Sequence, residues 1–261
     1  MYSNITRLFA GGALLLALSS CGDGRFPCVD GTGAITTETR TVSGFTAISN
    51  DMEATVYITQ GPEYSVQVSA QGNLMDEIKT TVSGSTLNIS SEHCIDNAEP
   101  ITVYITLPEI SSIDLSGSGA IITQNKISSA ALSIDISGSG TFTSMDSIVA
   151  TSLESDVSGS GTVTAEIYVT SVSINISGSG EITLSGTGST MNQEISGSGN
   201  MHTYNFQVGS AYVKISGAGN LELNALDLID GSISGSGSIY YMNSPVINVD
   251  ISGSGELIHV P

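Results

Sequence analysis

The chain has 261 residues, of which 25 are acidic and only 6 are basic, so its formal net charge at pH 7 is −19. This shortage of Lys and Arg excludes nucleic acid as a natural partner, because binding to phosphates requires basic side chains. It also disfavours close contact between the folded body and an anionic membrane surface.

Residues 1–20 have the pattern of an export signal. Arg7 is the only charge, and an apolar run extends from Leu8 to Leu18 before small residues follow. This run is too short to span a membrane as a mature helix. The segment Leu18-Ser19-Ser20-Cys21 resembles a bacterial lipobox, which implies cleavage before Cys21 and lipidation of that residue. The alternative is an ordinary secretory signal with a cysteine at this point by chance.

Residues 21–35 are rich in glycine and are expected to form a flexible tether. If Cys21 carries lipid, Cys28 and Cys94 remain as a pair in an oxidising compartment. We therefore expect a Cys28–Cys94 disulfide that ties the tether to the folded body. Two unpaired thiols are the alternative, because sequence does not show whether the two residues lie close enough to bond.

Residues 36–110 show alternating strand patterns without a short repeat. The segment Gln60–Glu63 separates two such patterns and predicts a hairpin turn. Val82–Ser85 is interpreted as an early, degenerate copy of the repeat described next. No linker separates this region from the rest, so we expect one continuous domain over residues 36–261, with residues 36–110 capping the end of a repeat structure.

The tetrapeptide Ser-Gly-Ser-Gly recurs through the remainder of the chain. Successive copies begin 18 to 21 residues apart, and this period, together with strand-forming residues and no helical spacing, predicts a β-solenoid. We therefore expect an all-β fold, a right-handed parallel β-helix over residues 111–261. The copies, one of which reads Ser-Gly-Ala-Gly, begin at Ser116, Ser137, Ser158, Ser177, Ser196, Ser216, Ser234 and Ser252.

Apolar residues occupy fixed positions around each copy. Even numbers of residues separate these apolar residues from the glycines of the motif. On a strand, both sets therefore point to the inward face, while the serines point outward. Stacked coils would turn each position into a buried ladder. The glycines mark either the place where the coil turns or the place where two walls of a flattened helix nearly touch. The ladder immediately before the motif reads Leu115, Ile136, Val157, Ile176, Ile195, Ile215, Ile233 and Ile251.

Several segments resemble the head GIN domain family, which is associated with autotransporter-type adhesins and bacterial lipoproteins. The resemblance lies in Arg40–Ile48, Val56–Val68 and Thr80–Ile89, and in the entry to the repeats from Leu107 to Gly119. It extends over about residues 36–261. It implies a β-helix fold and an adhesin-like role, and it assigns no binding residues.

One outward column is acidic at its beginning. Asp114, Asp135 and Asp156 each lie two residues before a motif, and stacking would place them about 5 Å apart. Such a column can be a solvated face with mild repulsion or a possible ligand face that binds a cation, although hard cations need six or more oxygen ligands. Two carboxyl groups at this separation also occur in glycosidases, so a polysaccharide-acting β-helix enzyme is the alternative function.

The favoured function is a non-enzymatic, lipid-anchored cell-envelope protein, an adhesin or surface-binding module. We expect it at the outer membrane, facing the cell surface or the periplasm, with a glycan or protein partner and no cofactor or metal. Candidate tyrosines for stacking on sugars are Tyr168, Tyr204, Tyr240 and Tyr241. The final coil can leave an open edge, so a homodimer is expected through the C-terminal coil, at His259, Val260 and Pro261.

Overall fold

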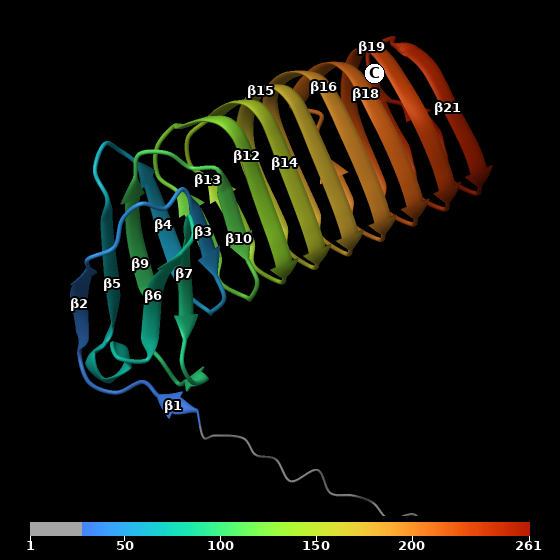
Figure 1. Ribbon diagram of the computed structural model, residues 1–261. Coiled ribbons are helices and arrows are strands. Elements are labelled where there is room, and N and C mark those ends of the chain that lie inside the picture. Colours follow the sequence, from blue (N-terminus) through green and yellow to red (C-terminus); the bar gives the residue numbers. More distant parts are fainter. Residues whose placement is uncertain (1–27) are drawn as a thin grey trace, which may run out of the picture.

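The computed structural model describes residues 28–261, and the predicted signal and lipidation site, Cys21, lie outside these residues. The described chain is nearly all-β and forms a β-solenoid of about eight turns (Figure 1). This confirms the predicted all-β, parallel β-helix fold. Among the described residues, no helix has the length and apolar character needed to cross a membrane.

Two walls of strands extend along the solenoid, and the long strands β15, β16 and β19 bend to join both. The first wall contains, in spatial order, β6 (Ile78–Ser83), β7 (Thr86–Ser91), β3 (Ala47–Asn50), β10 (Ser112–Leu115), β12 (Ile127–Gly138), β14 (Ile148–Gly159), β15 (Thr162–Gly178), β16 (Glu181–Gly197), β18 (Phe206–Gly217), β19 (Asn220–Gly235) and β21 (Val246–Gly253).

The second wall contains, in spatial order, β2 (Ile35–Arg40), β5 (Ser65–Gln71), β9 (Thr102–Leu107), β4 (Thr55–Gln60), β11 (Ala120–Thr123), β13 (Thr141–Ser144), β15, β16, β17 (Asn200–His202), β19, β20 (Ile239–Met242) and β22 (Leu257–His259). The pairings are parallel except β6–β7 in the first wall and β2–β5 and β5–β9 in the second.

The antiparallel strands β2, β5 and β6 form the cap, together with the short 3-10 helix Gly72–Leu74. They cover the first coils with fully buried side chains, among them Val66, Val68 and Ile78. The region 36–110 is therefore more than a cap, because β3 and β4 form one coil and β7 and β9 form another. In space the β7–β9 coil precedes the β3–β4 coil, although it follows it in sequence.

Two local expectations in this region are wrong. The segment Gln60–Glu63 does not close a hairpin, because β9 lies between β4 and β5 and pairs with both. Val82–Ser85 is not a copy of the repeat but the turn of the β6–β7 hairpin, where Gly84 has a φ of 61°. In the coil formed by β3 and β4, the segment after Asn50 occupies the place that the repeat motif has in later coils. The register shows this, because Asn50 pairs with Leu115, the residue before the first copy of the motif.

Apolar ladders fill the solenoid, as the sequence pattern predicts. Ile136 and Ile176 are each 1% exposed, and the ladder before the motif is buried from Leu115 to Ile233. Burial of one such aliphatic side chain contributes roughly 1.5–3 kcal/mol. The final member, Ile251, departs from the expectation, because it is 45% exposed. No further coil of the described chain covers it.

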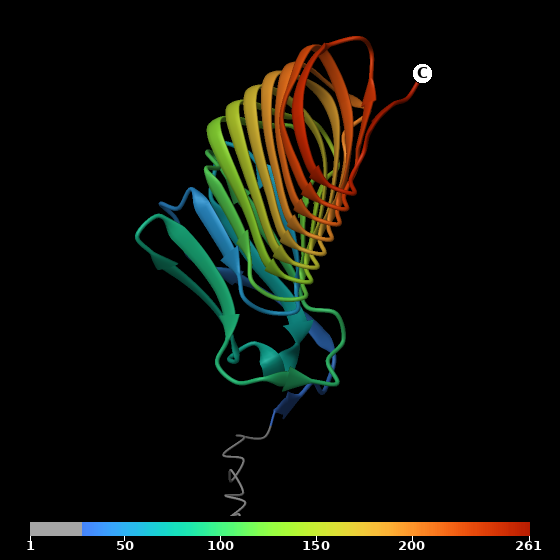
Figure 2. The ribbon, with the colours of Figure 1, turned by 90° about the vertical axis from the view of Figure 1, so that its right-hand side faces the viewer.

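Glycines at the motif bring each coil directly onto the backbone of the preceding one. Gly159 has a φ of +126°, and a Cβ atom there would lie 2.5 Å from the carbonyl oxygen of Gly138. The second glycine of the same motif makes room for the apolar ladder, since a Cβ atom at Gly161 would lie 2.5 Å from Cγ2 of Ile136. Figure 2 shows the coils tapering toward this edge.

The predicted Cys28–Cys94 disulfide is confirmed. The two Cα atoms lie 4.6 Å apart, and the adjoining strands β1 (Val29–Asp30) and β8 (Ile95–Asp96) pair in parallel. The bond fastens the first described residue to the cap, at the opposite end of the solenoid from the last coil (Figure 1).

We predict that Gly159→Ala destabilises the protein by about 3 kcal/mol, because the new methyl group meets a backbone oxygen and φ is unfavourable for an L-residue. The matched control is Gly117→Ala in the first copy, where the nearest atom to a Cβ, the carbonyl oxygen of Met52, lies 3.7 Å away. Chemical denaturation measures both. Equal stability of the two variants would contradict close glycine stacking.

Candidate functional site

The acidic column lies on the outer face of the first wall, in the predicted order. The register pairs Asp114 with Asp135 and Asp135 with Asp156. The column then continues through Asn175, Glu194 and Lys214. The stacking of the three predicted aspartates is therefore seen in the structure, at the inter-strand spacing of about 4.8 Å.

Neighbouring polar groups reduce the repulsion along this column. The Ser133 hydroxyl donates a hydrogen bond to Asp135 at 2.9 Å, and the Asn175 amide donates one to Asp156 at 2.6 Å. Farther along, Lys214 forms an ion pair with Glu194 at 2.6 Å. These contacts offset part of the repulsion between adjacent carboxylates.

Asp114 lies in a less favourable environment than an exposed carboxylate. Partial burial raises its pKa, and the charges of Asp135 and Asp51 add to this effect, while a hydrogen bond from the Ser49 hydroxyl at 3.3 Å opposes it. The ionised side chain is therefore a source of instability near neutral pH.

The chemistry of the first wall is limited by its shape. Among residues 28–261, no group of three or more His, Cys, Asp or Glu side chains is arranged to hold a metal ion. The aspartates project from a regular parallel sheet, on successive strands of a single wall. An array of this kind can present charge to a partner, but it does not place two carboxyl groups on opposite sides of a bound sugar, as glycosidases do.

The second wall presents a different surface over its six strands nearest the cap, β2, β5, β9, β4, β11 and β13. Its outward residues there carry no charge and are mainly threonines. We call this surface the threonine–tyrosine patch, and its outward members are Ile35, Thr37, Thr39, Ser65, Gln67, Ser69, Thr102, Tyr104, Thr106, Thr55, Tyr57, Thr59, Ala120, Ile122, Thr141 and Thr143.

Two stacked tyrosines lie in the middle of this patch. Tyr57 and Tyr104 are register partners on β4 and β9, with ring centroids 5.3 Å apart and planes inclined by 13°. Tyr104 is 44% exposed. The pair therefore joins apolar ring surface to two hydroxyl groups, within a surrounding of threonine hydroxyls that both donate and accept hydrogen bonds.

Sequence reasoning missed this pair. It selected Tyr168, Tyr204, Tyr240 and Tyr241, of which Tyr168 is 41% exposed and donates a hydrogen bond to Glu166 at 2.6 Å. Tyr57 and Tyr104 belong to different segments whose coils stack in the reverse of their sequence order. The available signal was the similarity of the strands Thr55-Val-Tyr-Ile-Thr and Thr102-Val-Tyr-Ile-Thr.

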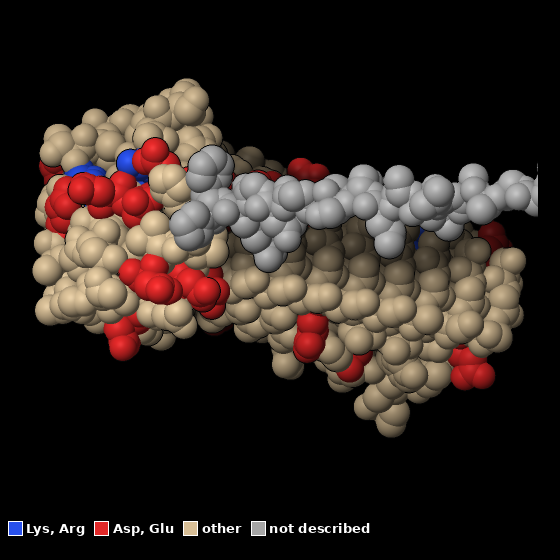
Figure 3. Space-filling model, turned by 90° about the horizontal axis from the view of Figure 1, so that it is seen from below, with Lys and Arg blue, Asp and Glu red and all other residues tan. Residues whose placement is uncertain are grey.

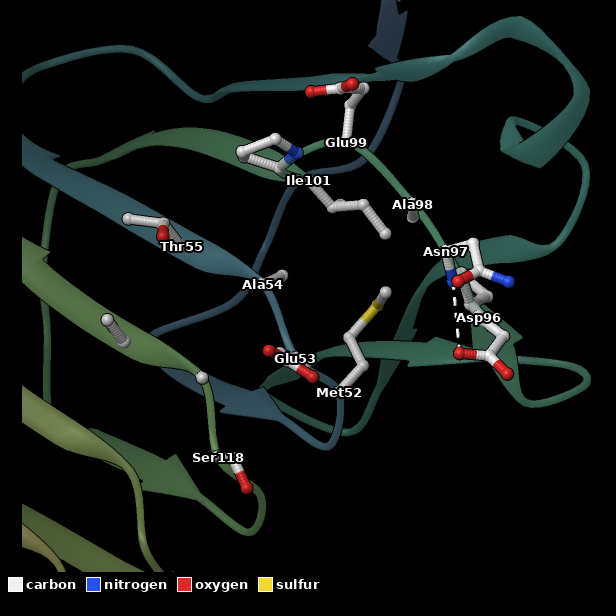
Figure 4. Close-up of a pocket in the computed structure, with 14 residues that line it drawn as sticks. Met52, Glu53, Ala54, Thr55, Asp96, Asn97, Ala98, Glu99, Ile101 and Ser118 are labelled. Carbon is white, nitrogen blue, oxygen red and sulfur yellow. Dashed lines mark hydrogen bonds between the residues drawn. The ribbon is translucent and has the colours of Figure 1, made fainter. Parts of the chain in front are cut away.

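A pocket of about 530 Å³ opens where the cap meets the motif edge (Figure 4). Its buried floor includes Met52 and Ile101, and the acidic residues Glu53, Asp96 and Glu99 also line it. The visible part of the motif edge in Figure 3 is largely free of charged side chains, whereas acidic side chains gather at the cap end. The pocket therefore combines an apolar floor with negative charge.

We predict that Asp114→Asn raises the melting temperature at pH 7, because it removes an ionised group whose pKa is raised by folding. The destabilising contribution of the wild-type carboxylate begins to decrease as pH falls through its raised folded pKa, and it is gone below the unfolded pKa of an aspartate, about 3.9, so the advantage of the variant should vanish there. Thermal melts from pH 7 to pH 3.5 measure this. Glu63→Gln, at an exposed carboxylate in the segment between β4 and β5, is the control outside the acidic column. Equal melting temperatures of Asp114→Asn and wild type at pH 7 would contradict the effect.

Solved structures of similar proteins agree with this fold. A crystal structure described as a putative lipid binding protein from Parabacteroides distasonis has a TM-score of 0.86 and 26% identity, covering 90% of this chain and 100% of that one. A putative adhesin from the same species has a TM-score of 0.86 and 21% identity, with the same coverage. A putative adhesin from Parabacteroides merdae has a TM-score of 0.85 and 20% identity, covering 89% and 99%.

The search of curated proteins found no match. A family model described as "Putative auto-transporter adhesin, head GIN domain" matches residues 44–245. That range contains both walls from β3 to β20 and includes the threonine–tyrosine patch except for its outermost strand, β2. The chain belongs to the head GIN domain family.

Proposed function

We propose that this protein is a non-enzymatic, lipid-anchored adhesin of the cell envelope that binds neutral glycans on its threonine–tyrosine patch. The observation that carries the proposal is the stacked Tyr57–Tyr104 pair within a patch whose outward residues carry no charge. The family and the similar crystal structures described as adhesins support a binding role.

The chemistry of the patch favours a neutral glycan over a charged partner. Sugar rings present both C–H surface and hydroxyl groups, which match tyrosine rings and threonine hydroxyls respectively. An anionic glycan would gain no ion pair on this patch and would be repelled by a chain of net charge −19. A flat solenoid face also binds through extended area rather than a deep pocket.

A lipid ligand and a catalytic role have less support. One similar structure is described as a putative lipid binding protein. In this chain, however, the solenoid interior is filled by aliphatic ladders such as Ile134 and Ile174. The alternative of a polysaccharide-acting enzyme relies on Asp114, Asp135 and Asp156, which lie along one regular wall.

The position of the disulfide supports an anchor at the cap. Cys28 lies only seven residues after Cys21 and is bonded to Cys94, which follows β7 at the capped end of the solenoid. A lipid on Cys21 would therefore hold the cap end near the outer membrane, whether the protein faces the cell surface or the periplasm. The remainder of the solenoid would extend from the anchor with its patch accessible.

We predict that the purified protein binds neutral glycans on an array and that Tyr104→Ala weakens the binding about tenfold, because the exposed ring of the stacked pair is lost. Isothermal titration calorimetry with the glycan that binds most strongly on the array measures the dissociation constants of the wild type and the variant. Tyr168→Ala is the matched control, since Tyr168 has similar exposure but lies outside the patch.

Three outcomes would contradict the binding proposal. They are no glycan binding, binding to acidic glycans alone, and equal losses in the Tyr104 and Tyr168 variants. A polysaccharide hydrolysis assay run in parallel tests the alternative function. Turnover that is abolished by Asp135→Asn would establish an enzyme in place of an adhesin.

We predict that membrane-extracted protein begins at a lipid-modified Cys21 and that Cys21→Ala releases it from the membrane fraction. Mass spectrometry of the mature N-terminus and cell fractionation measure these two results. Ser20→Ala, which keeps a small residue before the cysteine, is the control. An unmodified, soluble wild-type protein would refute the anchor while leaving the glycan proposal intact.

A further inference from the structure

The last coil exposes the edge of an apolar ladder. Strand β21 pairs with β19 on one side, and Figure 2 shows no other element of the described chain on its other side. Ile251 is 45% exposed and Ile247 is 39% exposed, whereas their register partners Ile233 and Ile229 are fully buried. The exposed pair therefore continues ladders that are covered in every preceding coil.

The two ends of the solenoid differ in this respect. At the first end, the antiparallel strands β5 and β6 cover the outermost coil. At the last end, β21 offers eight residues of backbone along its free edge. Soluble proteins commonly block such edges with lysine, proline or an inward-pointing charge. The stretch Val246–Gly253 contains no lysine or proline, and its one charged residue, Asp250, lies at the register position of outward Ser232.

We propose that two copies of this chain join end to end through antiparallel pairing of their β21 strands, around a two-fold axis centred at Val249. In this register, Ile247 lies opposite Ile251 of the partner subunit, and Val249 lies opposite the partner's Val249. Antiparallel pairing places opposed residues on the same face, so the inward apolar residues meet one another. Asn248 lies opposite Asp250 of the partner subunit. One amide hydrogen of Asn248 is donated to Asp230 of its own chain, and the second is left as a donor for the partner's Asp250.

The pattern of β21 selects a second copy as the occupant. Its central residues, Ile247 to Ile251, alternate between apolar and polar in the same way when read in either direction. Centring the axis at Asp250 would place two aspartates opposite each other, and centring it at Asn248 would leave Ile251 opposite the partner's Pro245. Only the register centred at Val249 pairs all three apolar residues and separates the charges, which is the self-complementarity that a two-fold interface requires.

This dimer is elongated. Cys28 lies at the capped end of each copy, opposite the joined ends (Figure 1). The two N-terminal attachment points would therefore lie at opposite ends of the assembly. The inference does not depend on glycan binding, because β21 is not part of the threonine–tyrosine patch.

Sedimentation equilibrium of the purified protein tests the interface. We expect a concentration-dependent species of about twice the mass of the mature chain, which mass spectrometry gives independently. Ile251→Asp should give a monomer, because it places charges inside the joined ladder. Met145→Asp is the control, since Met145 is 71% exposed but lies away from the last coil, and it should leave the dimer unchanged.

The register is tested by two variants that keep the apolar ladder intact. Asn248→Lys places an ammonium group opposite each partner Asp250 and should tighten the dimer about fivefold, whereas Asn248→Asp should loosen it by a similar factor. Because position 248 also lies beside Asp230 of its own chain, thermal melts of both variants in the Ile251→Asp background, where no dimer forms, measure their effect on the coil itself. Circular dichroism checks that each variant keeps its strand content. A wild-type monomer at all concentrations would overturn the proposal. So would a dimer that Ile251→Asp and both Asn248 variants leave unchanged, because it would use another surface.

Discussion

The close stacking of glycine backbone at the motif edge is the constraint on which the rest of the structure depends. At Gly159 and Gly178 a Cβ atom would lie 2.5 Å from the carbonyl oxygen of the glycine one coil earlier. Each coil therefore turns directly against its predecessor and resumes in the same register. The alignment of the interior ladders and the straightness of both walls follow from this repeated contact.

A fixed interior leaves the outward positions as the part of the repeat that can vary. The first wall uses these positions for Asp114 and its column, stabilised by serine, asparagine and lysine partners. The second wall uses them for threonines and the Tyr57–Tyr104 pair. One scaffold thus carries an acidic column on the first wall and the uncharged threonine–tyrosine patch on the second, and this patch combines a stacked pair of aromatic rings with many hydroxyl groups. This difference is why the proposed binding surface lies on the second wall.

The repeat region was predictable from the sequence because its spacing alone determines which residues share a face. The burial of Ile136 and the stacking of Asp114 on Asp135 both follow from that spacing. The cap region was not predictable in the same way. Strand β9 is inserted between β4 and β5 by long-range pairing, and no local turn signal at Gln60–Glu63 reveals it. The tyrosine pair depends on that same insertion, so the candidate site was missed together with the topology.

Hydrogen–deuterium exchange of the protein with and without a bound neutral glycan tests the central claim most directly. Ligand binding on the threonine–tyrosine patch predicts slower exchange in peptides that contain β4 and β9, with peptides from the first wall unchanged. Protection centred on β10, β12 and β14 would contradict the account, because it would place the ligand on the acidic column instead.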